Sequence, residues 1–398
     1  MAEAPWLTIV GLGEDGTDGL APASLAAIGA AEIVMGPPRH LALVAPGKAG
    51  RIDWPVPFAE GLPRMLAHRG RRVVVLASGD PFWFGAGRVI AEALAPGEWR
   101  ALPGLSCFAL AANRLGWPLE TTRCRALHAA PLSRLRADLA PGVRLIVTLR
   151  DGDAVRALAQ YLSDEGFGDT RLTLCEGLGG PREQLTEGTA GCLPDAAFRH
   201  PVCAALEVAG DGHVLPQTSG RPDTWFAHDG QITKRPVRAL TLSSLAPRIG
   251  EHLWDIGAGS GSVGLEWLLA DPSLSATAVE ADPGRAARIA ENAARLGLDR
   301  LTIVTGRAPE ALDGLAAPQA IFVGGGMSEA LLGWLTEHCA GARLVANAVT
   351  LESEALLACA HARLGGTLLR CELAEAATLG TRRGWQAARP IVQWSVTL

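Results

Sequence analysis

Short apolar runs alternate with Ala-, Leu- and Arg-rich segments along the whole 398-residue chain. Such runs predict buried strands, and their alternation with helices is typical of parallel sheets covered by helices. The stretch Leu20–Met35 is broken by Pro22, Gly29 and Glu32, so we expect a surface helix leading into a strand and no membrane span. The strands predicted in the first half are Trp6–Val10, Glu32–Met35, Arg72–Ala77, Trp99–Leu102, Leu145–Leu149, Arg171–Cys175 and Val202–Val208.

The alternating pattern lapses between about Ala209 and Asp229, where Gly, Asp, Pro and Ser are frequent. A polar, turn-rich stretch predicts a connection between domains. The chain is also too long for one ordinary domain. We therefore expect an α/β domain at 1–210, a linker at 211–228 and a second α/β domain at 229–398.

The second domain is predicted to start with a helix at Arg235–Leu245 and then to repeat strand and helix. Two late apolar runs, Thr367–Leu373 and Ile391–Val396, flank the polar stretch Thr378–Arg389 and predict an antiparallel pair at the sheet edge. The other predicted strands are Glu251–Ile256, Ser275–Val279, Leu301–Val304, Ala320–Val323 and Arg343–Ala346.

Composition and charge exclude several classes of protein. The net charge of −5 argues against binding nucleic acid through bulk attraction to phosphate. No basic segment followed by an apolar stretch opens the chain, so we expect a cytoplasmic protein without a signal peptide. No C-x-x-C pair and no cluster with metal-ligand spacing occurs, so we expect no metal. We expect core thiols at Cys107, Cys124, Cys175, Cys192, Cys203, Cys339, Cys359 and Cys371.

A glycine-rich loop follows the first predicted strand. Gly11–Gly16 matches the spacing G-x-G-x-x-G, so an NAD(P)-dependent oxidoreductase is an alternative that the sequence raises. Two features oppose it. Glu14 and Asp15 would repel a pyrophosphate. The loop also runs on to Pro22 before a helix can begin, so no helix start lies beside the third glycine.

A second glycine-rich loop, Asp255–Gly261, follows a strand and opens a helix in the second half. Its glycines allow a close approach of backbone to ligand, and exposed amides at a helix start favour an anionic group. Because Ser262 follows Gly261, the spacing is G-x-G-x-G and not that of a dinucleotide site. Glu280 ends the next strand, where an acid can accept both ribose hydroxyls.

Four segments of the second half, Asp229–Arg238, Leu253–Gly261, Phe322–Gly326 and Ala346–Thr350, resemble the decarboxylating precorrin-6Y methyltransferases of corrin (cobalamin) biosynthesis. The resemblance covers nearly all of residues 225–398. It implies a class I, Rossmann-like methyltransferase with a seven-stranded sheet, methylation at ring carbon 15 and loss of carboxylate from the acetate on carbon 12. It implies contacts to S-adenosylmethionine at Thr233, Gly257, Gly259, Ser260, Gly261, Glu280 and Ala308.

One position departs from the usual class I pattern. Arg307 stands where these enzymes commonly have an acid that accepts the adenine amino group. The adenine is then expected to be held by backbone atoms around Ala308, or to be stacked by Arg307.

The first half resembles the class III, tetrapyrrole-type methyltransferases over roughly residues 5–210. The segments that carry the likeness are Gly36–His40, Ser78–Gly85, Leu102–Cys107 and Cys175–Glu183, although Glu14 stands where the class usually has proline. The resemblance implies two αβ lobes, methylation at carbon 5 and a second S-adenosylmethionine site. That site is implied to involve Gly11, Gly13, Gly79, Asp80, Pro81, Ser106 and Cys107.

A precorrin carries many carboxylates, so arginines that bind carboxylates through two hydrogen bonds are expected near it. His40 is a candidate proton donor in a loop after a strand, and Trp83 could stack on the macrocycle. Homo-oligomers are expected by analogy with both enzyme types. A tetrapyrrole-binding protein with only one active half remains the other alternative. The predicted substrate contacts are Arg39, Arg88, Arg114, Lys234, Gly324, Gly325, Gly326, Asn347, Arg382 and Arg383.

Overall fold

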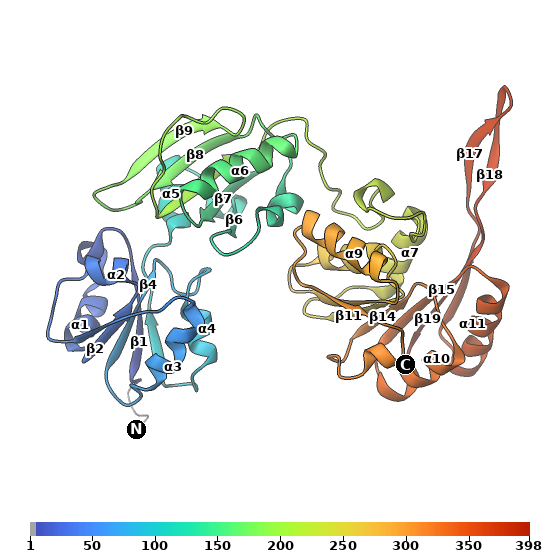
Figure 1. The fold of residues 1–398 in the computed structure, drawn as a ribbon, viewed down its shortest axis with the longest axis horizontal. Helices are drawn as coiled ribbons and strands as arrows, with labels where there is room; N and C mark the ends of the chain where they lie inside the picture. The colour runs from blue at the N-terminus through green and yellow to red at the C-terminus, as the bar shows by residue number, and fades with distance from the viewer. Residues whose placement is uncertain (1–4) are drawn as a thin grey trace. The chain divides into compact units, whose positions relative to one another are not determined.

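The computed structural model describes residues 5–398, and the packing of the chain divides it into two units (Figure 1). Unit 1 consists of the residues up to Leu132 together with Asp138–His213. Unit 2 consists of Ser133–Ala137 together with Val214–Leu398. Each unit has apolar cores of its own. The described residues include no helix that is long and apolar enough to cross a membrane.

Unit 1 begins with a lobe built on a parallel sheet of five strands in the order β3-β2-β4-β1-β5. Its central strands are continuous apolar runs and are buried, as expected where helices cover a parallel sheet. The elements of this lobe are β1 (Leu7–Leu12), α1 (Pro22–Ala30), β2 (Ile33–Gly36), α2 (Pro38–Leu43), β3 (Gly50–Asp53), α3 (Gly61–Leu66), β4 (Val73–Ser78), α4 (Gly87–Glu92) and β5 (Trp99–Leu102).

The second lobe of unit 1 carries a five-stranded sheet in the order β6-β7-β10-β8-β9, in which β6 and β7 are parallel and the other neighbours antiparallel. Ser106 and Asp151 start its helices by accepting a backbone N–H three residues further on. The elements are α5 (Cys107–Leu115), β6 (Arg123–Ala126), β7 (Arg144–Leu149), α6 (Gly152–Asp164), β8 (Arg171–Glu176), β9 (Gln184–Thr189) and β10 (Val202–Glu207).

Unit 2 is built on a seven-stranded sheet in the order β13-β12-β11-β14-β15-β19-β16. Only β19 runs against its neighbours, and it pairs with both β15 and β16. The elements are α7 (Arg235–Leu245), β11 (His252–Ile256), α8 (Ser262–Ala270), β12 (Ser275–Glu280), α9 (Pro283–Arg295), β13 (Leu301–Thr305), β14 (Ala320–Val323), α10 (Glu329–His338), β15 (Arg343–Ala348), α11 (Leu351–Leu364), β16 (Thr367–Cys371), β17 (Ala374–Leu379), β18 (Arg382–Ala387) and β19 (Ile391–Thr397).

The strands β17 and β18 form a separate two-stranded ribbon between β16 and β19. In Figure 1 this ribbon projects away from the seven-stranded sheet of unit 2. Nearly all of its residues are exposed, including Leu379 at 71% and Trp385 at 80%. Short 3-10 turns lie elsewhere in the chain, at η1 (Gly16–Gly19), η2 (Phe58–Glu60), η3 (Leu119–Thr121), η4 (Leu132–Asp138), η5 (Asp223–Trp225) and η6 (Glu310–Leu312).

The structure confirms the α/β class, the seven-stranded sheet and the helix at Arg235–Leu245. It differs in the segment expected to be a linker, which is folded in unit 2 from Val214 onward, with Leu215 and Phe226 buried in its core. The prediction that the cysteines are core thiols is wrong for Cys192 and Cys359, which are exposed.

Candidate functional site

Three glycines meet at the carboxyl ends of β1, β4 and β5 in unit 1. A Cβ atom on Gly11 would lie 1.9 Å from the Gly79 carbonyl oxygen and 2.3 Å from the Gly104 nitrogen. The Gly104 N–H donates to the Gly79 carbonyl at 3.1 Å. Side chains would therefore force these segments apart, and the sheet edge presents backbone groups in their place. Gly104 was not among the predicted site residues, although it lies within the recognised segment Leu102–Cys107.

The Gly79–Pro81 turn is held from both sides. Gly79 has a φ of +53°, and Asp80 Oδ1 accepts the Phe82 N–H at 2.9 Å. The Pro81 carbonyl accepts the Gly87 N–H at 2.8 Å, at the start of α4. The Asp80 carboxylate therefore shapes the turn, and its second oxygen faces no partner among the described contacts. A Cβ on Gly79 would lie 3.0 Å from the Ser106 Cα, so the turn abuts the start of α5 and Cys107.

The loop after β1 does not continue as a dinucleotide site would. Gly16 opens only the 3-10 turn η1, and α1 begins at Pro22. A Cβ on Gly13 would lie 2.5 Å from Asp15 Oδ1, so Gly13 makes room for that carboxylate. Glu14 is paired with arginines and is only 10% exposed at its side chain. No helix start is available beside Gly16 to bind a pyrophosphate.

An exposed aromatic surface lies beside this turn. Phe82, Trp83 and Phe84 are each about half exposed, at 47%, 52% and 51%. The rings of Trp83 and Phe84 meet edge to face at 5.9 Å, and Phe84 also packs 5.7 Å from Phe108. Exposed large aromatic groups in a fixed arrangement suit contact with a flat apolar ligand.

In unit 2 the loop between β11 and α8 contains three glycines in the left-handed conformation. Gly257, Gly259 and Gly261 have φ values of +66°, +60° and +74°. A Cβ on Gly257 would lie 2.7 Å from the Gly325 carbonyl oxygen, so this loop packs against the loop after β14. The backbone path therefore requires glycine independently of any ligand, and it leaves the loop's amides uncovered by side chains.

Two buried carboxylates support that loop. Glu280 at the end of β12 accepts the Gly259 N–H at 2.7 Å and the Asp282 N–H at 2.9 Å. Asp255 is fully buried and accepts the Gly264 N–H at 2.8 Å through Oδ2. Desolvation, together with the Glu280 charge, raises the pKa of Asp255 to about 7. In the described structure, Asp255 Oδ1 and Ser260 Oγ are buried without a hydrogen-bond partner.

The remaining cofactor contacts predicted in unit 2 lie in the neighbouring connections. The carbonyl of Thr233 accepts a hydrogen bond from Arg238, immediately before α7 begins. Ala308 lies in the loop after β13, which is joined to β12 where the Gly306 N–H donates to the Glu280 carbonyl at 2.9 Å. The Arg307 side chain is exposed.

Comparison with known proteins divides the chain in the same way. Residues 6–194 match the family described as Tetrapyrrole (Corrin/Porphyrin) Methylases, and residues 224–398 match the family described as Precorrin methyltransferase domain. A protein from Sinorhizobium sp named precorrin-6Y C(5,15)-methyltransferase [decarboxylating] is 48% identical over 99% of this chain and 97% of its own length. This chain belongs to that methyltransferase family.

A second relative supports this assignment. A protein of the same name from Mycobacterium tuberculosis (strain ATCC 25618 / H37Rv) is 40% identical over 98% of this chain and 99% of its own length. The solved C-terminal domain of precorrin-6Y C5,15-methyltransferase from Rhodobacter capsulatus is 55% identical over 46% of this chain and 99% of that domain, with a TM-score of 0.45. The family favours methyl transfer over the NAD(P)-dependent alternative.

The arginines predicted to bind substrate in this methyltransferase have different surroundings. Arg39 contacts Glu14 and Ser78 close to the Gly79–Pro81 turn. Arg88 instead pairs with Glu92 on the exposed face of α4, at 2.9 Å. Arg114 binds both oxygens of Glu183, at 2.5 and 2.9 Å. Of the three, Arg39 is the one with a described contact to Ser78, the residue before Gly79.

The predicted substrate residues of unit 2 are also separated. Lys234 precedes α7, with its Nζ 3.7 Å from Asp223. Arg382 and Arg383 lie on β18, at the outer end of the ribbon that leaves the sheet at the carboxyl end of β16. Gly324, Gly325 and Gly326 are exposed at that edge, after β14.

Asn347, on β15, is engaged within the protein. Its Nδ2 donates to Thr241 Oγ1 at 2.9 Å, and its Oδ1 accepts from Gln393 Nε2 at 2.9 Å. Gln393 is itself 4% exposed and also donates to Thr241. The amide of Asn347 is therefore oriented by α7 and β19, and its predicted contact with substrate would add to these bonds.

His40 lies in α2 and not in a loop as expected. It is 3% exposed, and its Nε2 accepts from the Arg39 guanidinium at 2.8 Å and lies 3.0 Å from Ser78 Oγ. Desolvation, together with the Arg39 charge, lowers the pKa of His40 to about 4. The ring is consequently neutral at pH 7, which favours a role in orienting Arg39 over proton donation.

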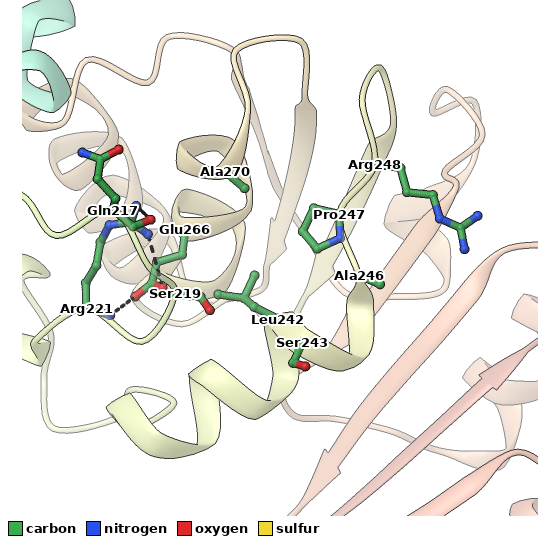
Figure 2. Close-up of a pocket in the computed structure, with 10 residues that line it drawn as sticks. All are labelled: Gln217, Ser219, Arg221, Leu242, Ser243, Ala246, Pro247, Arg248, Glu266 and Ala270. Atoms are coloured by element: carbon green, nitrogen blue, oxygen red, sulfur yellow. Dashed lines mark hydrogen bonds and ion pairs between the residues drawn. The ribbon is translucent and has the colours of Figure 1, made fainter.

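A surface hollow of about 560 Å³ in unit 2 lies away from the glycine loops, towards the carboxyl ends of α7 and α8 (Figure 2). Its wall includes Arg221 and Glu266, which are joined by an ion pair. Within the described chain its lining contains none of the predicted site residues. We therefore assign it no part in the candidate sites.

Proposed function

We propose that this chain transfers two methyl groups from S-adenosylmethionine to carbons 5 and 15 of a precorrin and removes the carboxylate of the acetate on carbon 12. Unit 1 is assigned the transfer to carbon 5, and unit 2 the transfer to carbon 15 and the decarboxylation. The observation that carries the proposal is the presence of a glycine-lined strand edge in each unit of a chain that is related over its whole length to enzymes of that name.

The residues of unit 2 suit a donor that carries an adenosine and an amino acid. Glu280 uses one hydrogen bond on each carboxylate oxygen, and further lone pairs can accept ribose hydroxyls. Asp255 Oδ1 and Ser260 Oγ have no hydrogen-bond partner in the described structure, so both remain able to form hydrogen bonds beside the glycine loop. In unit 1 the backbone groups around Gly11, Gly79 and Gly104 form the edge of the sheet at which we propose that the other donor binds.

The proposed chemistry asks little of acid or base groups. The donor supplies a sulfonium methyl, and a ring carbon forms the new C–C bond as the S–CH3 bond breaks. The chain contributes alignment and the exclusion of water. Rigid turns at Gly79–Pro81 and Gly257–Gly261 provide the alignment. The exposed rings of Phe82, Trp83 and Phe84 provide an apolar surface beside the first turn. In the decarboxylation, the bond from the CH2 carbon to the carboxylate breaks, CO2 leaves, the electron pair passes into the conjugated macrocycle, and uptake of one proton completes the methyl group.

We further propose that the chain forms a homo-oligomer through the β17–β18 ribbon. A two-stranded ribbon is marginally stable in water without a packing partner. This one exposes Trp385 and Leu379, and its strongest packing is between its own two strands. A second copy of the ribbon offers the same surface in return, as a two-fold interface requires.

Mass spectrometry of the product from a reduced precorrin tests the reaction. The expected mass change is a gain of two methyl groups and a loss of one carbon dioxide. Equilibrium titration of the full chain with S-adenosylmethionine should give two donor sites per chain. A product with one added methyl, or a stoichiometry of one, would instead support the alternative in which only one half is active.

A further inference from the structure

We propose that Arg39 and Arg182 form a carboxylate-binding subsite in unit 1, which takes one peripheral carboxylate of the substrate and in which Glu14 neutralises one of the two positive charges. The inference rests on the proposed function, since it concerns the polyanionic macrocycle methylated by that unit. Neither Arg182 nor Glu14 is among the site residues predicted from the sequence. Both are brought to Arg39 by the fold, from positions far apart in the sequence.

Arg39 is oriented by contacts on three sides. Its guanidinium is paired with Glu14, donates to Ser78 Oγ at 3.2 Å and donates to His40 Nε2 at 2.8 Å. Ser78 immediately precedes Gly79, so Arg39 is fixed next to the predicted donor turn. Its side chain is still 29% exposed, which leaves part of the guanidinium open to a ligand.

Arg182 reaches the same carboxylate from the second lobe. It lies in the turn between β8 and β9, and its Nη2 is 3.3 Å from Glu14 Oε2. Glu14 is the one partner described for the Arg182 guanidinium, and the Arg182 side chain is 59% exposed. A guanidinium has five N–H groups, so Arg182 retains enough donors for a two-pronged bond to another carboxylate.

The turn that carries Arg182 is itself fixed. A Cβ on Gly180 would lie 2.6 Å from Glu14 Cβ, so the turn rests directly on Glu14. Glu183 accepts the Gly179 N–H at 2.6 Å and binds Arg114 through both oxygens. Arg182 is thus presented by an ordered segment, and Arg114 acts as an anchor of that segment.

The charges of the cluster leave room for one more anion. Two guanidinium groups and one carboxylate carry a net charge of about +1 at neutral pH. Desolvation lowers the pKa of Arg39 and the charge of Arg182 lowers it further, which is the sign of two cations in close proximity. His200 lies within the electrostatic influence of both arginines. Desolvation lowers its pKa, and the Arg39 and Arg182 charges contribute to the decrease. A substrate carboxylate would relieve this repulsion.

Arg39 and Arg182 could serve only to join the two lobes of unit 1, or they could bind the substrate, and the two roles predict different effects of substitution. If the arginines only join the two lobes, then removing either end of the Arg182–Glu14 contact should have the same effect. If they form a subsite, the effects differ in sign. Loss of Arg182 removes a ligand for the substrate, whereas loss of the Glu14 charge frees the arginines and leaves a net charge of about +2 for the substrate to neutralise.

The test compares Arg182→Gln, Arg182→Lys and Glu14→Gln in the full chain, with Arg171→Gln as the control. Arg171 lies in the same lobe with 68% of its side chain exposed and a single ion contact of 3.8 Å. The readouts are kcat and KM for the precorrin in the carbon 5 methylation, KM for S-adenosylmethionine, and the melting temperature. Binding of uroporphyrin, a flat macrocycle with acetate and propionate groups, is measured by absorbance titration as a readout without turnover.

We expect Arg182→Gln to raise KM for the precorrin and Kd for uroporphyrin roughly tenfold or more, with kcat and the KM for the donor within about twofold. Arg182→Lys should recover part of the loss, because it restores charge without the two-pronged geometry. Glu14→Gln should leave KM unchanged or lower it, and Arg171→Gln should change neither constant.

Equal increases in KM for Arg182→Gln and Glu14→Gln, or no increase for Arg182→Gln, would overturn the subsite. If the wild-type chain methylates no precorrin at carbon 5, the proposed function fails, and uroporphyrin binding by the same variants then decides the subsite by itself.

Discussion

The Arg238 guanidinium and the Glu266 carboxylate form an ion pair of 2.7 Å in which neither side chain is exposed to solvent. Glu266 also accepts the N–H groups of Gly220 and Arg221, at 2.7 and 2.9 Å. Arg238 donates to the Thr233 carbonyl as well. One buried pair therefore joins α7 and α8 to the segment that leads to the predicted donor site of unit 2.

We expect Arg238→Met to lower the free energy of unfolding by roughly 3–5 kcal/mol, because it removes the nearer of the two cations paired with the buried Glu266 and leaves Arg221 alone, at 3.5 Å. For a domain of this size, such a loss corresponds to about 6–20 °C in melting temperature. Differential scanning calorimetry of the full chain measures it, since the two units can melt separately.

Arg363→Gln is the matched control for that variant. Arg363 pairs with Glu329 at 3.3 Å, but both side chains are more than half exposed. An exposed pair contributes up to about 1 kcal/mol, so the control should shift the transition by only a few degrees. Equal shifts in melting temperature for the two variants would show that the buried pair contributes no more to stability than the exposed pair.

The Asp255 carboxyl should make the stability of unit 2 depend on pH. Its pKa is raised from 3.8 to about 7 by burial and by the Glu280 charge, so between these values the folded chain holds a proton that the unfolded chain has released. The stabilisation from this carboxyl is therefore full below about pH 4 and declines as the pH rises towards 7.

Asp255→Asn removes this dependence while keeping an oxygen that can accept the Gly264 N–H. Relative to wild type, the variant should gain stability steadily between about pH 4 and 7 and show no further gain above that range. Denaturation curves across the range give the difference. A constant difference between variant and wild type would mean that Asp255 titrates normally.

Gly11→Ala should abolish one of the two donor sites. Its Cβ would lie 1.9 Å from the Gly79 carbonyl oxygen, so β1 and the Gly79–Pro81 turn must move apart. A displacement of about 1 Å costs on the order of 100-fold in rate, so carbon 5 methylation should fall at least that far. Equilibrium dialysis should show one remaining site for S-adenosylmethionine.

Gly29→Ala tests whether any loss is specific to that edge. Gly29 lies in α1, no atom is within 4 Å of its added Cβ, and alanine favours a helix. This variant should keep both donor sites and both methylations. Retention of two full-affinity sites in Gly11→Ala would remove unit 1 as a donor-binding unit.

If the β17–β18 ribbon is the interface between copies, a substitution on its surface should reduce oligomer formation. Trp385→Ser should lower the mass of the particle in sedimentation equilibrium, because it removes the largest apolar side chain from a surface that is otherwise exposed. Trp83→Ser should leave the mass unchanged and raise KM for the precorrin. An unchanged mass for Trp385→Ser would exclude the ribbon as the interface.

The buried strands were predictable because their apolar runs are continuous. The expected strands Trp99–Leu102 and Ala320–Val323 coincide with β5 and β14. The sequence did not reveal β3, β6, β9 or the ribbon. Residues of β3, β9 and the ribbon are largely exposed, so they show no apolar run from which a strand could be inferred. Pairing with a neighbouring strand forms them, and single-chain patterns do not record that pairing.

The glycine edges were predictable from spacing, whereas the charge pairs were not. Glu14 and Arg182 are 168 positions apart, and Arg238 and Glu266 lie on different helices. The substrate arginines were chosen by nearness to recognised segments, which cannot distinguish Arg39 from Arg88. That distinction depends on where the fold places each guanidinium: Arg39 contacts Ser78 beside the Gly79–Pro81 turn, and Arg88 lies exposed on α4 with Glu92.

The β17–β18 ribbon can change in length without disturbing the pairing of the sheet strands, unlike the rest of unit 2. Because β16 and β19 pair with each other at its base, the seven-stranded sheet is complete before the ribbon begins. Insertions or deletions there would leave the register of every sheet strand intact. The ribbon leaves the sheet at the carboxyl end of β16, the edge that also carries the glycine loops. Natural selection can therefore lengthen or shorten it, and so change how copies associate, beside the catalytic edge without shifting any strand of the sheet.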